Sequence, residues 1–84
     1  MKLKKVEVIW EDIVSGNSDW IDPSKAIEEA EKRAICYSVG YILKETKERI
    51  ILVQSISYED LDEIEEVSDT ITIPKKLISE MNDL

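Results

Sequence analysis

The chain has no His, no Phe, a single Cys, and only two Gly and two Pro among its 84 residues. Without His, no imidazole can act as a general base or a metal ligand, and one Cys allows neither an internal disulfide nor a Cys-based zinc site. Two Gly cannot form a phosphate-binding loop or a dinucleotide fingerprint. No apolar run approaches the roughly 20 residues of a membrane span, and from the first residues we expect no signal peptide. We therefore expect a non-enzyme of a reducing compartment, with no catalytic residue, metal, cofactor or membrane partner.

Acidic residues outnumber basic ones by 19 to 11, which gives a net charge of −8. A general binder of nucleic acid or anionic membranes needs a basic face, so neither activity is expected. Hydrophobic residues make up 43% of the chain, more than a disordered acidic tail carries. The thirteen Ile and six Val favour strands, because their side chains branch at Cβ. The length predicts a single domain over residues 1–84 with a small core.

The first stretch of the chain alternates in the manner of a strand. Val6, Val8 and Trp10 share one face, and charged residues occupy the other. We predict a half-buried strand from about residue 3 to Val14. Residues 15–19 are polar and contain Gly, which indicates a loop.

A helix start follows at Asp22 and Pro23. The Asp22 side chain can accept hydrogen bonds from free backbone N–H groups, and Pro23 suits the first helical position. Apolar residues then recur at helical spacing, including Ile27 and Ala30. The pattern predicts a helix from 23 to about 33. Because its apolar stripe is narrow and rich in Ala, we expect it to lie close against a sheet.

Residues 35–44 and 49–57 predict two strands joined by a short turn over 45–48. The larger side chains of the first strand share one face: Ile35, Tyr37, Val39, Tyr41 and Leu43. Gly40 interrupts this strand, and a glycine in mid-strand marks a bend, a bulge or the close approach of another group. The continuous apolar centre of the second strand predicts burial on both faces.

The last third of the chain changes character. Seven of the eleven residues over 59–69 are acidic, which predicts a solvated loop, with or without a helical turn near Asp60–Glu65. A fourth strand follows over 70–73, and Pro74 ends it. Two interpretations fit the tail, a helix or a tight turn over 74–77 followed by a fifth strand, and we favour the turn and strand.

The order of these elements predicts a mainly β fold with one inserted helix, an α+β class. Five short strands around a small core suggest a strongly bent antiparallel sheet or a small barrel of the SH3 or Sm-like type. The alternative is an open antiparallel sheet with the helix on one face.

Three features of the sequence could bind a ligand. Trp20 stands in a polar loop, where it could cover the edge of the core or stack on a ligand ring. Tyr41 directly follows Gly40, and a bare backbone beside an aromatic ring suits a flat ligand or a strand crossing. Lys75 and Lys76 follow a strand end, where they could neutralise a phosphate or balance the acidic segment.

Other candidate sites are weaker. The acidic segment 59–69 lacks the central Gly and the ligand spacing of a calcium-binding loop. Lone Cys36 has no His to activate its thiol, so we expect a buried apolar side chain.

Short motifs spread along the chain resemble a widespread group of small bacteriophage proteins. The pattern is a Trp-x-Asp, a second Trp in a polar loop, a Ser-Val-Gly-Tyr followed by an aliphatic pair, and an Ile-Pro-Lys near the end. In this sequence the motifs are Trp10-Glu11-Asp12, Trp20, Ser38-Val39-Gly40-Tyr41-Ile42-Leu43 and Ile73-Pro74-Lys75. The chain departs from the pattern at Lys76, where a small residue is common, and in its more acidic segment 59–69.

Small phage proteins of this kind include oligomeric sponges that sequester cyclic-nucleotide immune signals, such as those of CBASS. The resemblance therefore implies a viral protein of immune evasion, active in the host bacterial cytoplasm as a homo-oligomer that binds a small nucleotide non-covalently. Trp20 and Tyr41 would stack on bases, and Lys75, Lys76 and Arg33 would lie near phosphate.

A different hypothesis makes the acidic segment 59–69 the functional part. It would dock on a basic host surface, as an acidic protein-binding inhibitor or a nucleic-acid mimic. An Sm-like RNA binder would follow only from analogy of fold, and the net charge opposes it.

Overall fold

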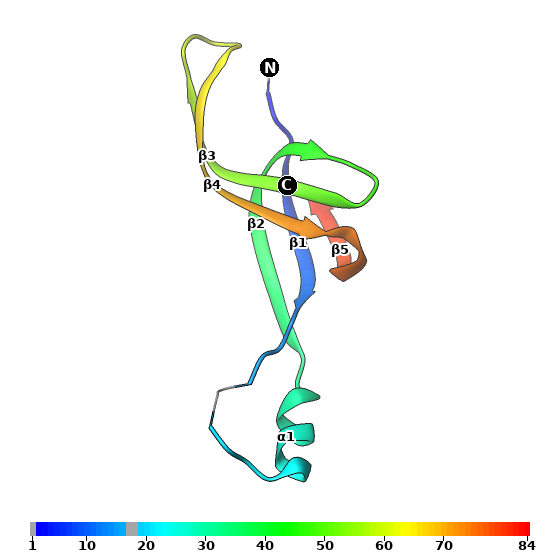
Figure 1. Cartoon of the computed structure of the whole chain (residues 1–84). Helices are drawn as coiled ribbons and strands as arrows, with labels where there is room; N and C mark the ends of the chain where they lie inside the picture. Colours follow the sequence, from blue (N-terminus) through cyan, green and yellow to red (C-terminus); the bar gives the residue numbers. More distant parts are fainter. Residues whose placement is uncertain (1, 17–18) are drawn as a thin grey trace.

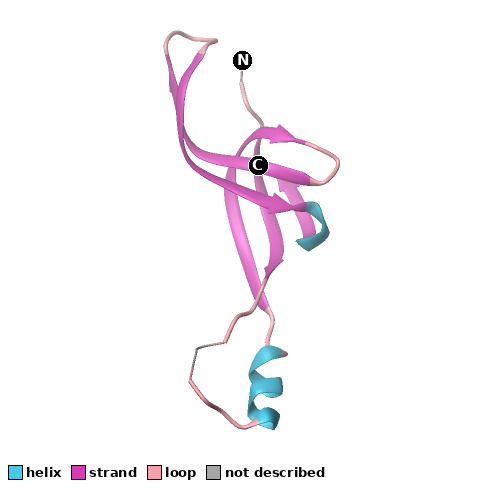
Figure 2. Cartoon of the chain, in the orientation of Figure 1, coloured by secondary structure: helices cyan, strands magenta, loops and turns pink. Residues whose placement is uncertain are grey.

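The computed structural model describes residues 2–16 and 19–84, and in these it has five strands, one α-helix and one 3₁₀ turn (Figures 1 and 2). The elements are β1 (Lys5–Asp12), α1 (Pro23–Ala30), β2 (Ala34–Glu45), β3 (Arg49–Tyr58), β4 (Ile64–Pro74), η1 (Lys75–Leu77) and β5 (Ile78–Asp83). The strands form one antiparallel sheet in the order β4-β3-β2-β1-β5. The predicted mainly β fold with one helix is confirmed. The sheet is open, because β4 and β5 remain at its two edges, so the barrel alternative does not apply.

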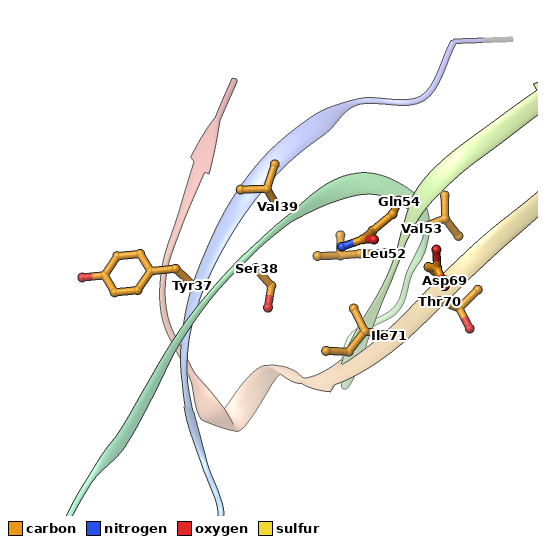
Figure 3. A pocket seen from close by; sticks show the side chains of 9 residues that line it. All are labelled: Tyr37, Ser38, Val39, Leu52, Val53, Gln54, Asp69, Thr70 and Ile71. Atoms are coloured by element: carbon orange, nitrogen blue, oxygen red, sulfur yellow. The ribbon is translucent and has the colours of Figure 1, made fainter.

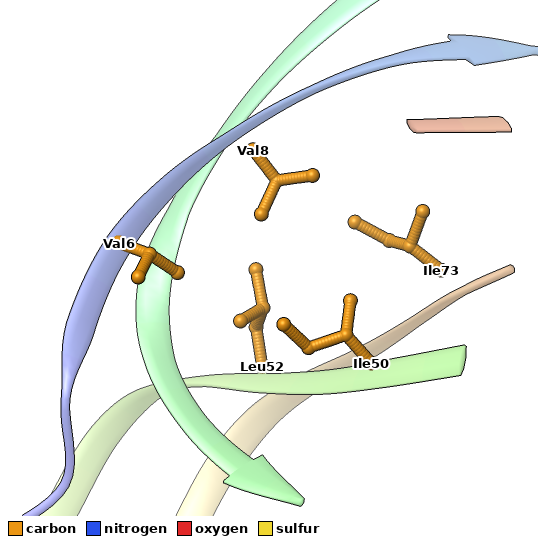
Figure 4. Packing of buried hydrophobic residues seen from close by; sticks show 5 residues of the cluster. All are labelled: Val6, Val8, Ile50, Leu52 and Ile73. Atoms are coloured by element: carbon orange, nitrogen blue, oxygen red, sulfur yellow. The ribbon is translucent and has the colours of Figure 1, made fainter. Parts of the chain in front are cut away.

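The sheet bends so that β3 and β4 cross one face of β1 and β2 (Figure 1). Register shifts at Ile42/Lys44 in β2 and Ile9/Trp10 in β1 accompany this bend. Side chains that alternate along the strands meet between the crossing layers (Figure 4). They form the core: Val6, Val8, Ile50, Leu52 and Ile73. Each such side chain contributes about 1.5–3 kcal/mol when it is fully buried.

Gly40 lies in β2 where β3 packs tightly against it. A Cβ at this position would stand 3.0 Å from the Val53 carbonyl oxygen and 3.2 Å from the Leu52 Cβ. Gly40 is buried and its φ is not positive, so the site requires Gly for lack of space and not for backbone conformation. The predicted close approach at Gly40 is confirmed.

The two faces of β2 have different environments. Cys36 and Ser38 lie on the inner face, opposite Trp10 and Val8 of β1, and the Trp10 indole Nε1 donates a hydrogen bond to Ser38 Oγ at 3.0 Å. Tyr37, on the outer face, is 67% exposed. The larger face of β2 therefore points away from the core.

The helix α1 begins where the sequence predicted. Asp22 is the N-cap and accepts a hydrogen bond from the Ser24 backbone N–H at 3.3 Å, and Pro23 is the first helical residue. None of the residues Pro23–Ala30 is buried, and α1 has no extensive contact with any strand. The prediction that the helix lies close against the sheet is wrong. Figure 1 shows α1 at the end of an arm, of which residues 13–16 and 19–33 are described, and which projects from the sheet.

The arm projects from the sheet because of the strand register at its base. Asp12, the last residue of β1, pairs with Ala34, the first residue of β2. The arm therefore leaves and re-enters the sheet at one point, as an extended hairpin connection. The chain measures 58 × 24 × 20 Å along its principal axes.

The acidic segment is more ordered than the sequence indicated. Only 59–63 form the turn, while Ile64–Asp69 belong to β4 and pair with β3 as far as Tyr58. The prediction of a loop over 59–69 is thus wrong for its second half, because the long strand β3 offers backbone hydrogen-bonding groups that β4 satisfies.

The prediction of a turn and a fifth strand at the tail is confirmed by η1 and β5. Among the described residues, no helix is long and apolar enough to cross a membrane.

Candidate anion-binding groove

A groove with a cationic lining lies between the β2–β3 turn and η1. Its volume is about 600 Å³, and it is open to solvent. The residues that line it are Lys47, Glu48, Arg49, Thr72, Pro74, Lys75 and Lys76. Four of these seven residues are cationic, although the whole chain carries a net charge of −8. We call this feature the cationic groove.

Backbone hydrogen bonds hold the two sides of the groove together. The Lys75 N–H donates to the Glu48 carbonyl oxygen at 2.8 Å, which ties η1 to the β2–β3 turn. Within the turn, the Thr46 hydroxyl accepts from the Arg49 N–H at 3.1 Å, and the Thr46 N–H donates to the Arg49 carbonyl at 2.9 Å. Arg49 also pairs with Pro74 in the register of β3 and β4. The cations therefore project from a fixed backbone frame.

Two carboxylates partly offset the charge of the groove. Lys75 Nζ lies 2.6 Å from Glu45 Oε2, and Arg49 Nη2 lies 3.8 Å from Glu48 Oε2. Within the described part of the chain, Lys47 and Lys76 form no salt bridge. The groove keeps a positive balance and two ammonium groups that can donate hydrogen bonds to an anion.

The structure places the sequence-predicted site residues in three separate regions. Lys75 and Lys76 line the cationic groove. Trp20 and Arg33 belong to the arm, and Trp20 is fully exposed there. Tyr41 is half-buried in β2, paired with Lys5 and Val53. Within one protomer, only the two lysines therefore share a site.

Sequence reasoning missed Lys47 and Arg49. They border a predicted turn, while Lys75 follows a predicted strand end, and these features lie 26 or more residues apart in the chain. The pairing of Arg49 with Pro74 brings them together. A correct strand register is thus the only signal that would have found them.

Arg33 has a partner at the base of the arm. Its Nε lies 3.0 Å from Glu11 Oε1 and its Nη2 lies 3.3 Å from Glu11 Oε2, a bidentate contact. Hydrogen bonding by Arg33 lowers the pKa of the Glu11 carboxyl, and the same contact raises the pKa of Arg33. A phosphate that took the Nε–Nη2 edge of Arg33 would have to displace Glu11.

A second, smaller groove of about 360 Å³ lies beside the strand crossing (Figure 3). Its lining includes Tyr37, Gln54 and Thr70, and its only charged member is Asp69. Asp69 has a φ of 59°, in the left-handed region that few residues other than Gly adopt. With one carboxylate and no cation, this groove does not suit an anionic ligand.

The opposite end of the β3–β4 ribbon is acidic. No Lys or Arg occurs over residues 50–74, and seven acidic residues lie over 59–69. Figure 1 shows this hairpin extending beyond the rest of the sheet. Among the described residues, no group of three or more Asp, Glu, Cys or His side chains is placed to hold a metal ion.

Comparisons with protein-family models, curated proteins and solved structures found no match.

Proposed function

We propose that this protein is a phage counter-defence protein that sequesters a cyclic or other small nucleotide signal by non-covalent binding in an oligomer. The observation that carries the proposal is the cationic groove. Lys47, Arg49, Lys75 and Lys76 gather around one cavity in a chain that is acidic elsewhere. Ammonium and guanidinium groups on a fixed frame are the donors that bind phosphate in proteins.

The net charge of −8 repels an anion at long range. At physiological salt, charges more than about 8 Å away are largely screened, so the local balance at the groove decides binding. The resemblance of the sequence motifs to a group of small phage proteins supports the biological setting, the host bacterial cytoplasm. No covalent step is proposed, since sequestration needs none.

Trp20 and Tyr41 stay our predicted base-stacking groups, and Arg33 a further predicted phosphate contact. Because none of them lines the cationic groove in one protomer, their participation requires a second copy to bring them near it. This requirement is why the proposal includes a homo-oligomer.

The test is thermal unfolding of the full chain with a panel of ligands: cyclic dinucleotides, cyclic trinucleotides and cyclic ADP-ribose isomers. A ligand at 100 times its Kd stabilises the folded state by about 2.7 kcal/mol, which raises the Tm of a small domain by several degrees. We expect at least one ligand to give such a shift. If no member of the panel shifts the Tm, the proposal is wrong.

A pair of double variants locates the site. Lys75→Gln with Lys76→Gln should weaken binding about tenfold or more, because charged hydrogen bonds to phosphate are lost. Lys25→Gln with Lys32→Gln changes the net charge equally on the arm and should leave binding nearly unchanged. Equal losses for both pairs would show a bulk charge effect and no site at the groove.

We propose one alternative, an acidic protein-binding inhibitor or nucleic-acid mimic, because the acidic hairpin projects free of the sheet. The variant with four neutralised carboxylates is Glu59→Gln, Asp60→Asn, Asp62→Asn and Glu63→Gln. Under this alternative, it should lose capture of a basic protein that the unmodified chain binds, and it should keep nucleotide binding. Under the first proposal, capture of a basic protein plays no part.

A further inference from the structure

The chain exposes more surface than a compact protein of its size. Its accessible surface is 6740 Å², whereas a folded monomer of 9.7 kDa exposes about 5,100 Å². The Cα radius of gyration is 17.2 Å, against about 12 Å for a compact chain of this length. The excess of about 1,600 Å² exceeds the roughly 800 Å² that each partner buries in a standard protein interface.

The arm exposes part of this surface. The apolar side chains exposed there include Ile13, Trp20, Ile21 and Ile27. An isolated helix needs about 12–15 residues to be even marginally stable in water, and most helices in proteins depend on packing of an apolar face. The eight-residue helix α1 has a well-formed cap and an apolar stripe, but none of its residues is buried and it has no extensive contact with any strand.

The outer face of β2 is the second uncovered apolar surface. Ile35, Tyr37 and Val39 are all exposed, while the inner face of the same strand packs on the core. β2 pairs with β3 only from Tyr41 to Glu45, so the part of β2 that carries these side chains is paired on one side, with β1. Its outer face offers an apolar surface to an incoming helix.

We propose that two copies of the chain exchange arms, so that the arm of each copy packs on the outer face of β2 in the other. Each chain has one arm and one outer face of β2. A mutual exchange therefore covers the arm and the β2 face of each copy, and it closes as a two-fold dimer. The excess surface is large enough for such an interface. The exchange also gives α1 the apolar cover that its own sheet does not supply.

The proposal deepens the oligomeric part of the proposed function. Its test uses no nucleotide, so a failure of ligand binding and a failure of the dimer are separate results. A small flat ligand or a different protein could in principle cover the outer face of β2, and the experiment separates these occupants from a second copy.

The experiment is sedimentation of the full chain over a wide range of concentration. We expect twice the mass of the 9.7 kDa protomer. Ile27→Lys on the arm and Tyr37→Lys on β2 should each raise the dissociation constant at least about tenfold, because each places a charge inside an apolar interface. Leu61→Lys is the matched control, since Leu61 is 90% exposed at the far hairpin. It should leave the dimer unchanged.

Crosslinking then identifies which surfaces meet. In a Cys36→Ser background, one preparation carries Ile27→Cys and another carries Tyr37→Cys. A mixture of the two should crosslink with a short bifunctional maleimide, and this product is necessarily between copies. A monomer at all concentrations, a dimer that survives both Lys variants, or efficient crosslinking of the Ile27→Cys preparation alone would each overturn the proposal. Capture of a ligand or another protein at β2 by a monomer would do the same.

Discussion

The sheet and the arm of this chain bury their apolar side chains to very different extents. Leu52 in β3 is 1% exposed, whereas Ile27 in α1 is 59% exposed, although each lies on the apolar face of an amphipathic element. The sheet buries its apolar side chains within one protomer because its bend brings β3 and β4 across β1 and β2 (Figure 4). The arm begins and ends at one sheet position, Asp12 and Ala34, and so has no layer to pack against.

This difference teaches that a periodic apolar pattern identifies the face an element will bury but not the surface that buries it. For the strands, the covering surface lies in the same chain. For α1, none of the residues Pro23–Ala30 is buried in the protomer. The free energy of unfolding of one protomer should therefore depend on the sheet and hardly at all on the arm.

The largest expected effect contrasts the two regions directly. Leu52→Ala should lower the free energy of unfolding by about 2–5 kcal/mol, because it leaves a cavity in the core. Ile27→Ala, at a concentration where sedimentation gives the protomer mass, should change it by less than about 0.5 kcal/mol. Urea unfolding followed by circular dichroism measures both. Comparable losses would mean that the arm is part of the cooperative unit of the sheet.

The two glycines give a second contrast of the same kind. Gly40→Val should destabilise the fold by about 1–3 kcal/mol, despite the higher strand propensity of Val, because the Val53 carbonyl and Leu52 leave no space for a branched side chain. Gly40→Ala should cost less. At Gly16, near the base of the arm, no heavy atom lies within 4 Å of the position that a Cβ would occupy, so Gly16→Ala should be neutral or slightly stabilising.

Thermal melts of the three glycine variants decide this point. If Gly40→Val melts at or above the parent temperature, the crowding between β2 and β3 has no energetic consequence. If Gly16→Ala costs as much as Gly40→Ala, the arm is more tightly constrained than its exposure indicates.

Local features of the fold could be predicted because local chemistry determines them. Asp22 and Pro23 mark the start of α1, Gly40 marks a close approach, and Pro74 ends β4. Features that depend on strand register could not be predicted from local chemistry. The extension of β4 through Ile64–Asp69 depends on the length of its partner β3, and a run of like charges conceals it.

The candidate site was accessible to sequence reasoning only in part. Lys75 and Lys76 stand out as a basic pair in an acidic chain, whereas Lys47 and Arg49 join them only through the pairing of β3 with β4. Trp20 and Tyr41 are candidate stacking groups because of the chemistry of their aromatic rings. No local sequence pattern predicts where the projecting arm places Trp20.

The smallest expected effect lies at the junction of sheet and arm, in the Glu11–Arg33 pair. Arg33 lowers the folded-state pKa of Glu11 below its ordinary value of 4.5, chiefly by hydrogen bonding. A lowered folded pKa stabilises the protein above the unfolded pKa, and this contribution disappears as the pH falls through the folded value. Arg33→Gln should therefore cost a little stability at neutral pH and nothing in strong acid. A difference that persists in acid would place its cause outside this pair.

The same pair tests whether Arg33 contacts phosphate, as the sequence suggested. The Glu11 carboxyl can be titrated by NMR without ligand and with a nucleotide that raises the Tm. If the phosphate takes the Nε–Nη2 edge of Arg33, it must displace the bidentate contact at 3.0 and 3.3 Å, and the pKa of Glu11 should rise toward 4.5. Arg33→Gln should produce the same rise without ligand and serves as the reference. If the nucleotide binds and the pKa of Glu11 stays low, this edge of Arg33 keeps its contact with Glu11 and the phosphate does not bind there.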